Sequence, residues 1–313
     1  MKKIMITGGL GFIGCHLAEL CIEKGYDVTI VSRSDSKLDN IHKIKDKVNL
    51  LLLDVKDIDE EVKGFNYIFH LAGSTDNYAI VDGKPYKDLE MNCITTLALL
   101  EAVKKHNQKA RVIFASTFFV NGKVEKLPVT LDTPCRPLGL YGATRLAAEH
   151  FCHIYHHIFD LDVVIARFTN VFGEREQGGK KKAGFNYMIK QAVEGNEIQV
   201  YDNGDFYRDY IYVTDVASAC LVIAEKGKSD ATYYVGRGEF VKFKKLVDIV
   251  VKKTNVKFKS ITSPDFHKRV GIKDFVCDNT ELKKLGWVPK VSLEEGIKKT
   301  IDYYKSLNKK IKA

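Results

Sequence analysis

The segment Lys3-Ile-Met-Ile-Thr7-Gly8-Gly9-Leu10-Gly11-Phe12-Ile13-Gly14 decides the fold of this 313-residue chain. A β-prone run leads into three glycines spaced three residues apart, and apolar residues then recur at helical spacing. In a strand–turn–helix unit the first glycine permits a tight turn, the second lets the backbone approach a pyrophosphate, and the third lets the helix pack on the strand. The N-terminus of the helix presents free N–H groups and a positive dipole end to the phosphates. We therefore expect a dinucleotide to bind at this turn.

Strand-like and helix-like segments alternate over the first half of the chain. We expect strands at Lys3–Thr7, Asp27–Val31, Asn49–Asp54, Phe65–Ala72, Ala110–Ala115 and Asp162–Phe168. We expect long helices at Phe12–Lys24, Leu89–His106 and Tyr141–Phe159. Strands separated by helices indicate β-α-β units and a parallel sheet that is buried on both faces. The predicted fold class is therefore α/β, a Rossmann-type doubly wound parallel sheet with a smaller C-terminal lobe.

The pattern becomes irregular after Phe168. A loop rich in Gly, Lys and Glu spans residues 173–184, and short helices and strands follow it. We expect residues 1–168, together with about 207–231, to form a dinucleotide-binding domain. Residues 169–206 and 232–313 are expected to form a substrate-binding lobe that packs against this domain. The Lys180–Lys182 cluster is interpreted as part of a solvated loop.

The composition argues against several classes of protein. Hydrophobic residues make up 45% of the chain, but no apolar run approaches the roughly 20 residues that span a bilayer. The formal net charge is +9, yet the lysines are dispersed and form no stripe interleaved with aromatic residues, so we expect no nucleic-acid partner. A basic chain instead suits an anionic substrate. Seven cysteines are scattered without a Cys-x-x-Cys pair, which predicts reduced, mostly buried thiols in a cytoplasmic protein.

The end of the second predicted strand indicates which dinucleotide binds. An acidic residue at this point normally holds the ribose 2′-hydroxyl of NAD. Here the strand ends with Val31-Ser32-Arg33-Ser34, and Asp35 follows only in the loop. Arg33 could pair with the 2′-phosphate of NADP, or it could be an arginine that faces solvent. We therefore expect the cofactor to be NADP(H) or NAD(H), and we favour NADP(H).

Polar residues of one predicted helix and of one predicted strand end form a candidate catalytic group. Tyr141 and Arg145 lie four residues apart in a predicted helix, so they share one face. A tyrosine can serve as a general acid or base when a neighbouring cation lowers its pKa. The fifth predicted strand leads into Ser116 and Thr117, which places hydroxyl groups at the carboxyl edge of the sheet, where ligands bind in such folds.

Taken in order, these motifs resemble those of the extended short-chain dehydrogenase/reductases of the NAD(P)-dependent sugar-nucleotide epimerase/dehydratase family, in particular its UDP-glucose 4-epimerase-like members. The resemblance runs nearly end to end and includes Arg208-Asp209-Tyr-Ile-Tyr-Val-Thr-Asp215 and Leu285-Gly286-Trp287-Val288-Pro289. It implies a nucleotide-diphosphate sugar as the substrate. It also implies a homodimer, formed through the helices at Leu89–His106 and Tyr141–Phe159.

The resemblance also implies roles for individual residues. Its catalytic residues would be Thr117, Tyr141 and Arg145. With Arg33 added from the argument above, the cofactor-binding residues would be Gly8, Gly11, Phe12, Ile13, Gly14, Arg33, Asp54, Val55, Leu71, Ala72, Gly73, Asn92, Tyr141 and Arg145. The substrate-binding residues would be Thr117, Asn170 and Arg208, with Arg269 added from its C-terminal position. The chain departs from the family pattern Tyr-x-x-x-Lys at Arg145, where a planar guanidinium replaces the ammonium group.

The two residues after Thr117 help to distinguish possible reactions. The resembled 4,6-dehydratases carry an Asp-Glu pair there, and the 3,5-epimerising reductases carry a cysteine at the second position. Here the positions hold Phe118 and Phe119, which disfavours both reactions. The remaining expectation is redox chemistry at a hexose carbon, with C4 epimerisation favoured by the overall resemblance. The alternatives are an NADPH-dependent reduction of a 4-keto sugar and, because of Arg145, a non-catalytic nucleotide sensor.

Several histidines lie on the predicted helix at Tyr141–Phe159. His153 and His157 are four residues apart, as a pair of metal ligands would be. No carboxylate motif accompanies them, and the expected chemistry needs no metal. We therefore expect no metal site.

Overall fold

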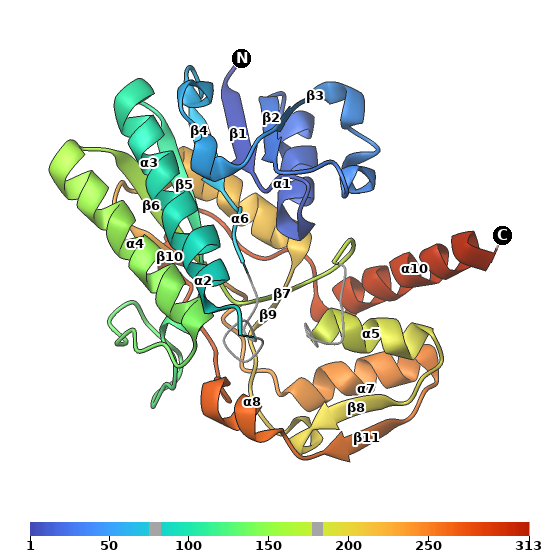
Figure 1. Ribbon diagram of the computed structural model, residues 1–313. Coiled ribbons are helices and arrows are strands. Elements are labelled where there is room, and N and C mark those ends of the chain that lie inside the picture. The colour runs from blue at the N-terminus through green and yellow to red at the C-terminus, as the bar shows by residue number, and fades with distance from the viewer. Residues whose placement is uncertain (75–82, 177–183, 313) are drawn as a thin grey trace.

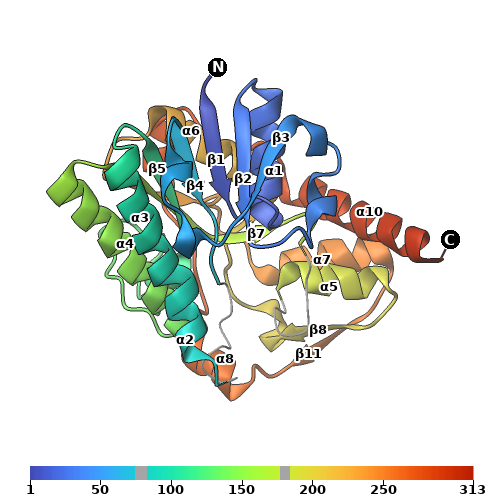
Figure 2. The ribbon, with the colours of Figure 1, turned by 45° about the horizontal axis from the view of Figure 1, so that its top comes forward.

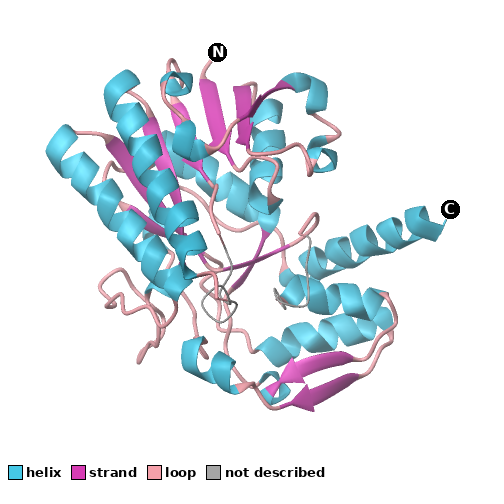
Figure 3. Cartoon of the chain, in the orientation of Figure 1, coloured by secondary structure: helices cyan, strands magenta, loops and turns pink. Residues whose placement is uncertain are grey.

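Seven strands form the central sheet of the computed structural model, which describes residues 1–74, 83–176 and 184–312 (Figure 1). In spatial order they are β10 (Thr232–Val235), β6 (Asp162–Phe168), β5 (Arg111–Thr117), β4 (Tyr67–His70), β1 (Lys3–Thr7), β2 (Asp27–Ser32) and β3 (Val48–Leu52). Every pair of neighbouring strands in this sheet is parallel. Figure 3 shows these strands flanked by helices, which confirms the predicted doubly wound α/β fold.

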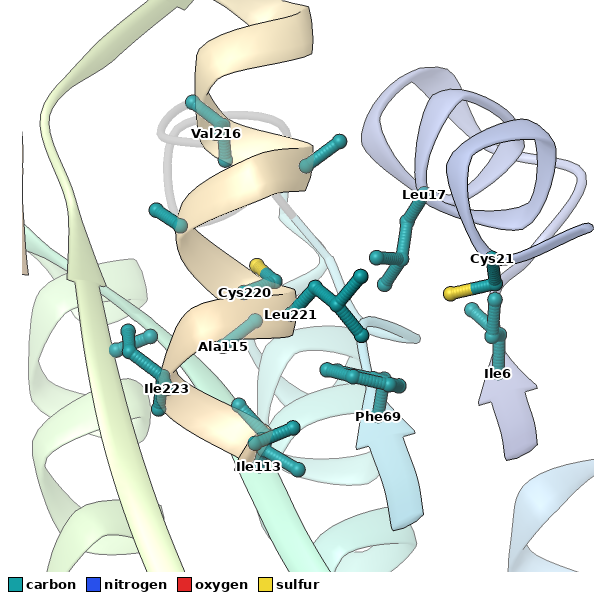
Figure 4. Packing of buried hydrophobic residues seen from close by; sticks show 14 of the residues in the cluster. Ile6, Leu17, Cys21, Phe69, Ile113, Ala115, Val216, Cys220, Leu221 and Ile223 are labelled. Carbon is teal, nitrogen blue, oxygen red and sulfur yellow. The ribbon is translucent and has the colours of Figure 1, made fainter. Parts of the chain in front are cut away.

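Helices cover both faces of this sheet. α1 (Phe12–Glu23) and α6 (Val213–Lys226) pack together on one face, where Leu17 and Leu221 lie near Phe69 of β4 (Figure 4). α3 (Thr95–His106) and α4 (Leu140–Phe159) belong to the hydrophobic cluster on the opposite face. Because both faces are buried, the inner strands contain continuous apolar runs, such as residues 163–166 of β6, instead of alternating with polar residues.

A separate hydrophobic cluster lies beyond the carboxyl edge of the sheet (Figure 2). It is formed by α5 (Phe185–Val193), α7 (Phe243–Thr254), α10 (Leu293–Lys312) and the paired strands β8 (Ile198–Tyr201) and β11 (Phe258–Ile261). We call this unit the lobe. A small parallel sheet of β7 (Asn170–Phe172) and β9 (Tyr210–Tyr212) connects the central sheet to the lobe.

The remaining helices are short. They are α2 (Pro85–Asp88), α8 (Asp265–Val270) and α9 (Thr280–Lys284). Each predicted strand and helix of the first 168 residues is present with its ends shifted by two residues or fewer, apart from one helix start. The helix expected from Leu89 begins with a π-helical turn at Leu89–Ile94 and becomes regular α-helix only at Thr95. Such turns are frequent at functional sites, and this one contains Asn92.

The division between the two units differs from the sequence-based expectation. Residues 232–235 were assigned to the lobe, but they form the edge strand β10, because its buried residues pair with β6. Residues 280–287 also return to the central unit, where Leu282 and Trp287 are buried in the cluster around α6. Conversely, β9 pairs with β7 and not with the central sheet. That the rest of the lobe binds substrate stays a prediction.

All seven cysteines are unpaired, and all except Cys135 are buried. None of the helices within residues 1–74, 83–176 and 184–312 combines the length and the apolar character that a membrane span requires.

Candidate active site

The glycine turn after β1 brings two strand ends into direct backbone contact. Gly8 has a φ of 72° and donates its N–H to the carbonyl of Val31 at 2.9 Å. A Cβ atom on Gly8 would lie only 2.9 Å from the backbone nitrogen of Ala72, which follows β4. A Cβ atom on Gly14 would lie 2.5 Å from the carbonyl oxygen of Gly8. Both positions therefore require glycine, because backbone atoms and not movable side chains occupy the space.

The first turn of α1 is suited to an anion. The helix begins at Phe12 with no capping side chain and no acidic residue in its first turn. The N–H groups of this turn have no partner within the helix, and the helix dipole is positive at this end. Phe12, Ile13 and Gly14 can therefore present backbone N–H groups to a phosphate.

A cavity of about 340 Å³ lies beside this turn, between the ends of β1 and β4, where the strand order reverses. Ligands of doubly wound sheets bind at such a point. Among the residues expected at the cofactor, the ones that line the cavity are Gly8, Gly11, Arg33, Asp54, Val55, Leu71, Ala72 and Gly73. Sequence reasoning missed other lining residues, among them Leu10, Ser32, Ser34, Ser36 and Lys37. Ser32 ends β2, and Ser34, Ser36 and Lys37 follow it in the chain, so their closeness to Arg33 was the available signal.

Thr117 ends β5 at the carboxyl edge of the sheet, and its side chain is buried. Its hydroxyl oxygen accepts the N–H of Phe119 at 3.3 Å, which leaves the hydroxyl hydrogen to be donated elsewhere. Ser116 donates to Glu149 of α4, and Glu149 forms a buried ion pair with Arg167 at 2.7 Å. This network fixes the end of β5 to α4 and β6.

Tyr141 lies in the first turn of α4, close to the residues that follow Thr117. Its ring meets the ring of Phe119 edge to face, with centroids 5.9 Å apart. The approach is possible because the next residue is Gly142, where a Cβ atom would lie 2.6 Å from the carbonyl oxygen of Phe119. The fold therefore brings Tyr141 and Thr117 to one corner of the carboxyl edge.

Arg145 lies one helical turn after Tyr141 and is only 3% exposed. Its Nη1 donates to the carbonyl of Ala115 at 2.9 Å, and its Cζ lies 5.8 Å from the ring centroid of Tyr141. A Cβ atom on Gly73 would lie 2.1 Å from Nη2 of Arg145, so the absent side chain makes room for the guanidinium. The buried Nε has no partner within the part of the chain that the structure describes. The arginine thus keeps a cation beside Tyr141, and its Nη2 lies next to the cavity wall at Gly73.

Asn92 is fully buried and connects three segments behind the cavity. Its side-chain amide donates to the hydroxyl of Thr144 on α4 at 2.9 Å. Its side-chain oxygen accepts the N–H of Ser74 at 2.9 Å, directly after Gly73. Asn92 does not line the cavity itself, but it holds the backbone that does.

His70 is the last residue of β4, and it is linked to Asn92 through Thr96. The Thr96 hydroxyl donates to the carbonyl of Asn92 at 2.6 Å, so it accepts from Nε2 of His70 at 3.1 Å. Nδ1 of His70 is then left to accept from the hydroxyl of Thr7 at 2.8 Å. Burial and the nearby Arg145 lower the pKa of His70 to about 3, so the imidazole is neutral and acts as a structural link between β1 and β4.

The residues expected at the substrate lie around the small β7–β9 sheet and α8. The Asn170 amide donates to the carbonyl of Asp209 at 3.2 Å, which places Asn170 beside the Arg208-Asp209 segment. The Arg208 guanidinium lies over the ring of Phe206 and donates to the carbonyl of Lys273. Arg269 is exposed on α8, whose last residue lies near Gly139 at the start of α4. Asn170 and Arg208 are therefore neighbours, whereas Arg269 comes from a separate element.

Asp209, which the motif Arg208–Asp215 contains, has a structural role. Its buried carboxylate accepts backbone N–H groups of Arg237, Gly238 and Cys277 at 2.8 to 3.2 Å. It thereby ties the loop after β10 and the segment before α9 to the start of β9. Sequence reasoning identified the motif but not this function of its acidic residue.

Two histidines of α4, His153 and His156, have structural partners. His153 bonds to Asp230 at 2.6 Å, and His156 bonds to the carbonyl of Leu161 at 2.8 Å. Among the described residues, no three His, Cys, Asp or Glu side chains are grouped so that they could hold a metal ion. The Lys180–Lys182 cluster lies outside the described residues.

Comparison with models of protein families shows which family the chain belongs to. The model of the NAD dependent epimerase/dehydratase family matches residues 4–236. The chain belongs to this family. Membership confirms the resemblance drawn from the motifs and makes the chain an NAD-dependent enzyme. NAD(H), one of the two expected cofactors, is thus confirmed for the family, while the preference for NADP(H) stays a prediction.

Individual relatives cover nearly the whole chain but differ in reaction. A putative UDP-glucose 4-epimerase of Methanocaldococcus jannaschii is 29% identical, over 98% of this chain and 99% of that protein. UDP-glucuronic acid decarboxylase 1 of Danio rerio is also 29% identical, over 97% of this chain and 72% of that protein. The crystal structure of UDP-glucuronic acid 4-epimerase from Bacillus cereus, in complex with UDP-glucuronic acid and NAD, has a TM-score of 0.86 and 25% identity, over 97% of this chain and 99% of that one.

Alanine substitutions at two glycines separate the effect of backbone strain from the effect of close packing at the glycine turn. Gly8 and Gly25 have similar positive φ angles, 72° and 79°, but a Cβ atom on Gly25 would meet nothing within 4 Å. The variant Gly25→Ala should therefore lose only about 1 kcal/mol of stability through strain and should bind NAD as the wild type does. Gly8→Ala should in addition push the Leu71–Ala72 backbone away and weaken NAD binding about tenfold or more. Isothermal titration calorimetry measures both affinities, and equal NAD binding by the two variants would contradict the proposed cavity.

Proposed function

We propose that this chain epimerises a UDP-linked hexose through redox chemistry at C4. The observation that carries the proposal is that Arg145 lies against Gly73 of the cavity wall and beside Tyr141, whose ring contacts Phe119, two residues after Thr117. A dinucleotide fits the cavity, because glycines leave its backbone open and α1 directs N–H groups toward it. The relatives named as UDP-sugar 4-epimerases support the substrate class and the reaction. A non-catalytic sensor would not need this group of side chains.

In the proposed reaction, Tyr141 removes the proton from the C4 hydroxyl of the sugar and later returns it. Thr117 donates a hydrogen bond to the same oxygen, since its bond with the N–H of Phe119 uses a lone pair of the hydroxyl and not its hydrogen. Arg145 holds a fixed positive charge beside Tyr141, since Nη1 is tied to the carbonyl of Ala115. The bound nicotinamide supplies the acceptor and then the donor of the hydride.

The aromatic residues after Thr117 support this reaction over dehydration. The ring of Phe119 lies against Tyr141, where an elimination would need a carboxylate to move a second proton. The ring of Phe118 is buried against Phe275, with centroids 4.7 Å apart. Neither position offers a group that can exchange a proton.

Replacement of Tyr141 by phenylalanine tests the mechanism. The variant Tyr141→Phe should lose about 100-fold or more in kcat while its affinity for NAD stays close to the wild-type value, because only the acid–base group is removed. Tyr155→Phe is the matched control: this tyrosine lies on the same helix, and its hydroxyl bonds to Glu101. Turnover should be followed with UDP-glucose and UDP-galactose. Wild-type turnover by Tyr141→Phe would refute the role of the phenol.

A second candidate function is the NADPH-dependent reduction of a 4-keto sugar nucleotide. It is favoured by the part of the cavity at the end of β2, where Ser32, Arg33, Ser34, Ser36 and Lys37 line the wall. Hydroxyl groups and two cations suit a 2′-phosphate, whereas a 2′-hydroxyl is usually held by a carboxylate.

The variant Arg33→Ala distinguishes the two cofactors. If Arg33 binds a 2′-phosphate, the variant should bind NADPH about 10- to 100-fold more weakly and NADH unchanged, since a bond to a charged group is lost only with NADPH. Lys43→Ala, an exposed cation that does not line the cavity, should leave both affinities unchanged. Tight NADH binding by the wild type with no effect of Arg33→Ala on NADPH would eliminate this candidate and leave the 4-epimerase.

We further propose a homodimer formed by α3, α4 and the turn before them. Ile154 and Ile158 of α4 and Ile94 of the π-turn are exposed, and Ile158 is 60% exposed in the single chain. Apolar side chains in this number on adjacent helices favour a covering partner, and a second copy is the simplest one.

The free thiols support the expected cytoplasmic location, because reducing compartments keep cysteines unpaired.

A charge on α4 tests the dimer. Ile158→Glu should shift the sedimentation coefficient from dimer to monomer, because an unpaired carboxylate cannot be buried in an apolar interface. Phe240→Glu, an equally exposed apolar position on another face, should sediment as the wild type does. A wild-type chain that sediments as a monomer at micromolar concentration would refute the dimer.

A further inference from the structure

The residues that follow β7 form a contact between the central unit and the lobe. β7 starts at Asn170, the residue expected at the substrate, and leads through Gly173 into Glu174, Arg175 and Glu176 (Figure 1). Arg175 has a φ of 67°, a conformation that residues with side chains rarely adopt. Such a backbone persists only where surrounding contacts impose it, so the contacts of this segment are informative.

One set of contacts joins the segment to the dinucleotide side. The Arg175 guanidinium pairs with Glu19 of α1 at 2.8 Å, and its Nη1 donates to the carbonyl of Asn40 at 2.8 Å. The Asn40 amide donates in turn to the carbonyl of Leu10 at 2.9 Å. Leu10 belongs to the glycine turn and lines the cavity. Arg175 is therefore linked to the glycine turn through a single residue, Asn40.

A second set of contacts joins the same segment to the lobe. The Tyr304 hydroxyl of α10 donates to the carbonyl of Glu176 at 2.9 Å. The Asn186 amide of α5 donates to that hydroxyl at 3.2 Å, and its oxygen accepts the N–H of Gly173 at 3.1 Å. Both Asn186 and Tyr304 are buried. The segment is thus held by Glu19 and Asn40 of the central unit on one side and by the lobe on the other.

We propose that Arg175 is a positioning residue that couples occupancy of the dinucleotide cavity to binding of the UDP moiety. The inference rests on the proposed function for the identity of the two ligands. A dinucleotide that orders the glycine turn also orders Leu10, Asn40 and Arg175. Residues 173–176 are then already in place when the UDP moiety binds, so less conformational entropy is lost in that step. Each ligand therefore tightens the binding of the other.

The test measures binding alone. Isothermal titration calorimetry gives the Kd of UDP with and without saturating NAD, and their ratio is the coupling factor. In the wild type we expect a factor of about five or more, and in Arg175→Leu a factor near one. Leucine has a Cβ atom as arginine does, so the backbone strain at this position is unchanged. Lys299→Leu removes an exposed cation of α10 that pairs with Glu295, and it should keep the wild-type factor.

A purely structural role predicts a different pattern. It would lower the melting temperature of Arg175→Leu and leave the ratio of the two Kd values at the wild-type value, which would overturn the proposal. Should Arg175→Leu fail to fold, Asn40→Ala replaces it, because this change removes the link to Leu10 and leaves the backbone carbonyl that Arg175 uses; its factor should also fall toward one. If the wild type binds both ligands without coupling, the inference is wrong and the proposed function stands. If the wild type binds neither NAD, NADPH nor UDP, both are wrong.

Discussion

The close approach of the Gly8 turn to the backbone after β4 is the constraint on which the rest of this structure depends. At 2.9 Å from Ala72 N, the position that a Cβ atom of Gly8 would take leaves no room for any side chain. The contact brings the ends of β1 and β4 together where the strand order reverses, and it leaves a cavity in front of the N-terminus of α1. Neutral His70 stabilises this contact further, because it bonds to Thr7 of β1 and to Thr96 of α3. The predicted binding of phosphate at this turn rests on backbone geometry and not on any charged side chain.

A second set of close approaches positions the residues that are proposed to be catalytic, between the end of β5 and the start of α4. Gly142 lets α4 reach the residues after Thr117, and Gly73 makes room for the Arg145 guanidinium. An arginine is longer than the lysine of the family pattern, and here its extra reach is used in a bond to the carbonyl of Ala115. The substitution therefore changes the shape of the cation and the number of its donors but keeps the charge beside Tyr141.

The parts of the fold that could be predicted from sequence are those with local signals. The glycine spacing, the apolar runs of β1 and β6 and the helix from Tyr141 need only neighbouring residues to be recognised. β10 could not be assigned to the central sheet, because its position depends on pairing with β6, which lies far away in the chain. The roles of Asn40 and Arg175 were missed for the same reason, since each acts through a carbonyl or carboxylate that is distant in sequence. The motifs indicated which residues are the candidates for catalysis. That the Thr117 hydroxyl accepts the N–H of Phe119, and so keeps its hydrogen for another bond, could be seen only in the structure.

Transfer of the hydride from C4 tests the central claim most directly. The enzyme would be incubated with NAD and UDP-glucose deuterated at C4, and the dinucleotide would be recovered and analysed by mass spectrometry. The account predicts that deuterium passes from C4 of the sugar to the nicotinamide and returns to C4 in the UDP-galactose product. Conversion of the substrate with deuterium that never leaves the sugar, or that is lost to water, would contradict redox chemistry at C4.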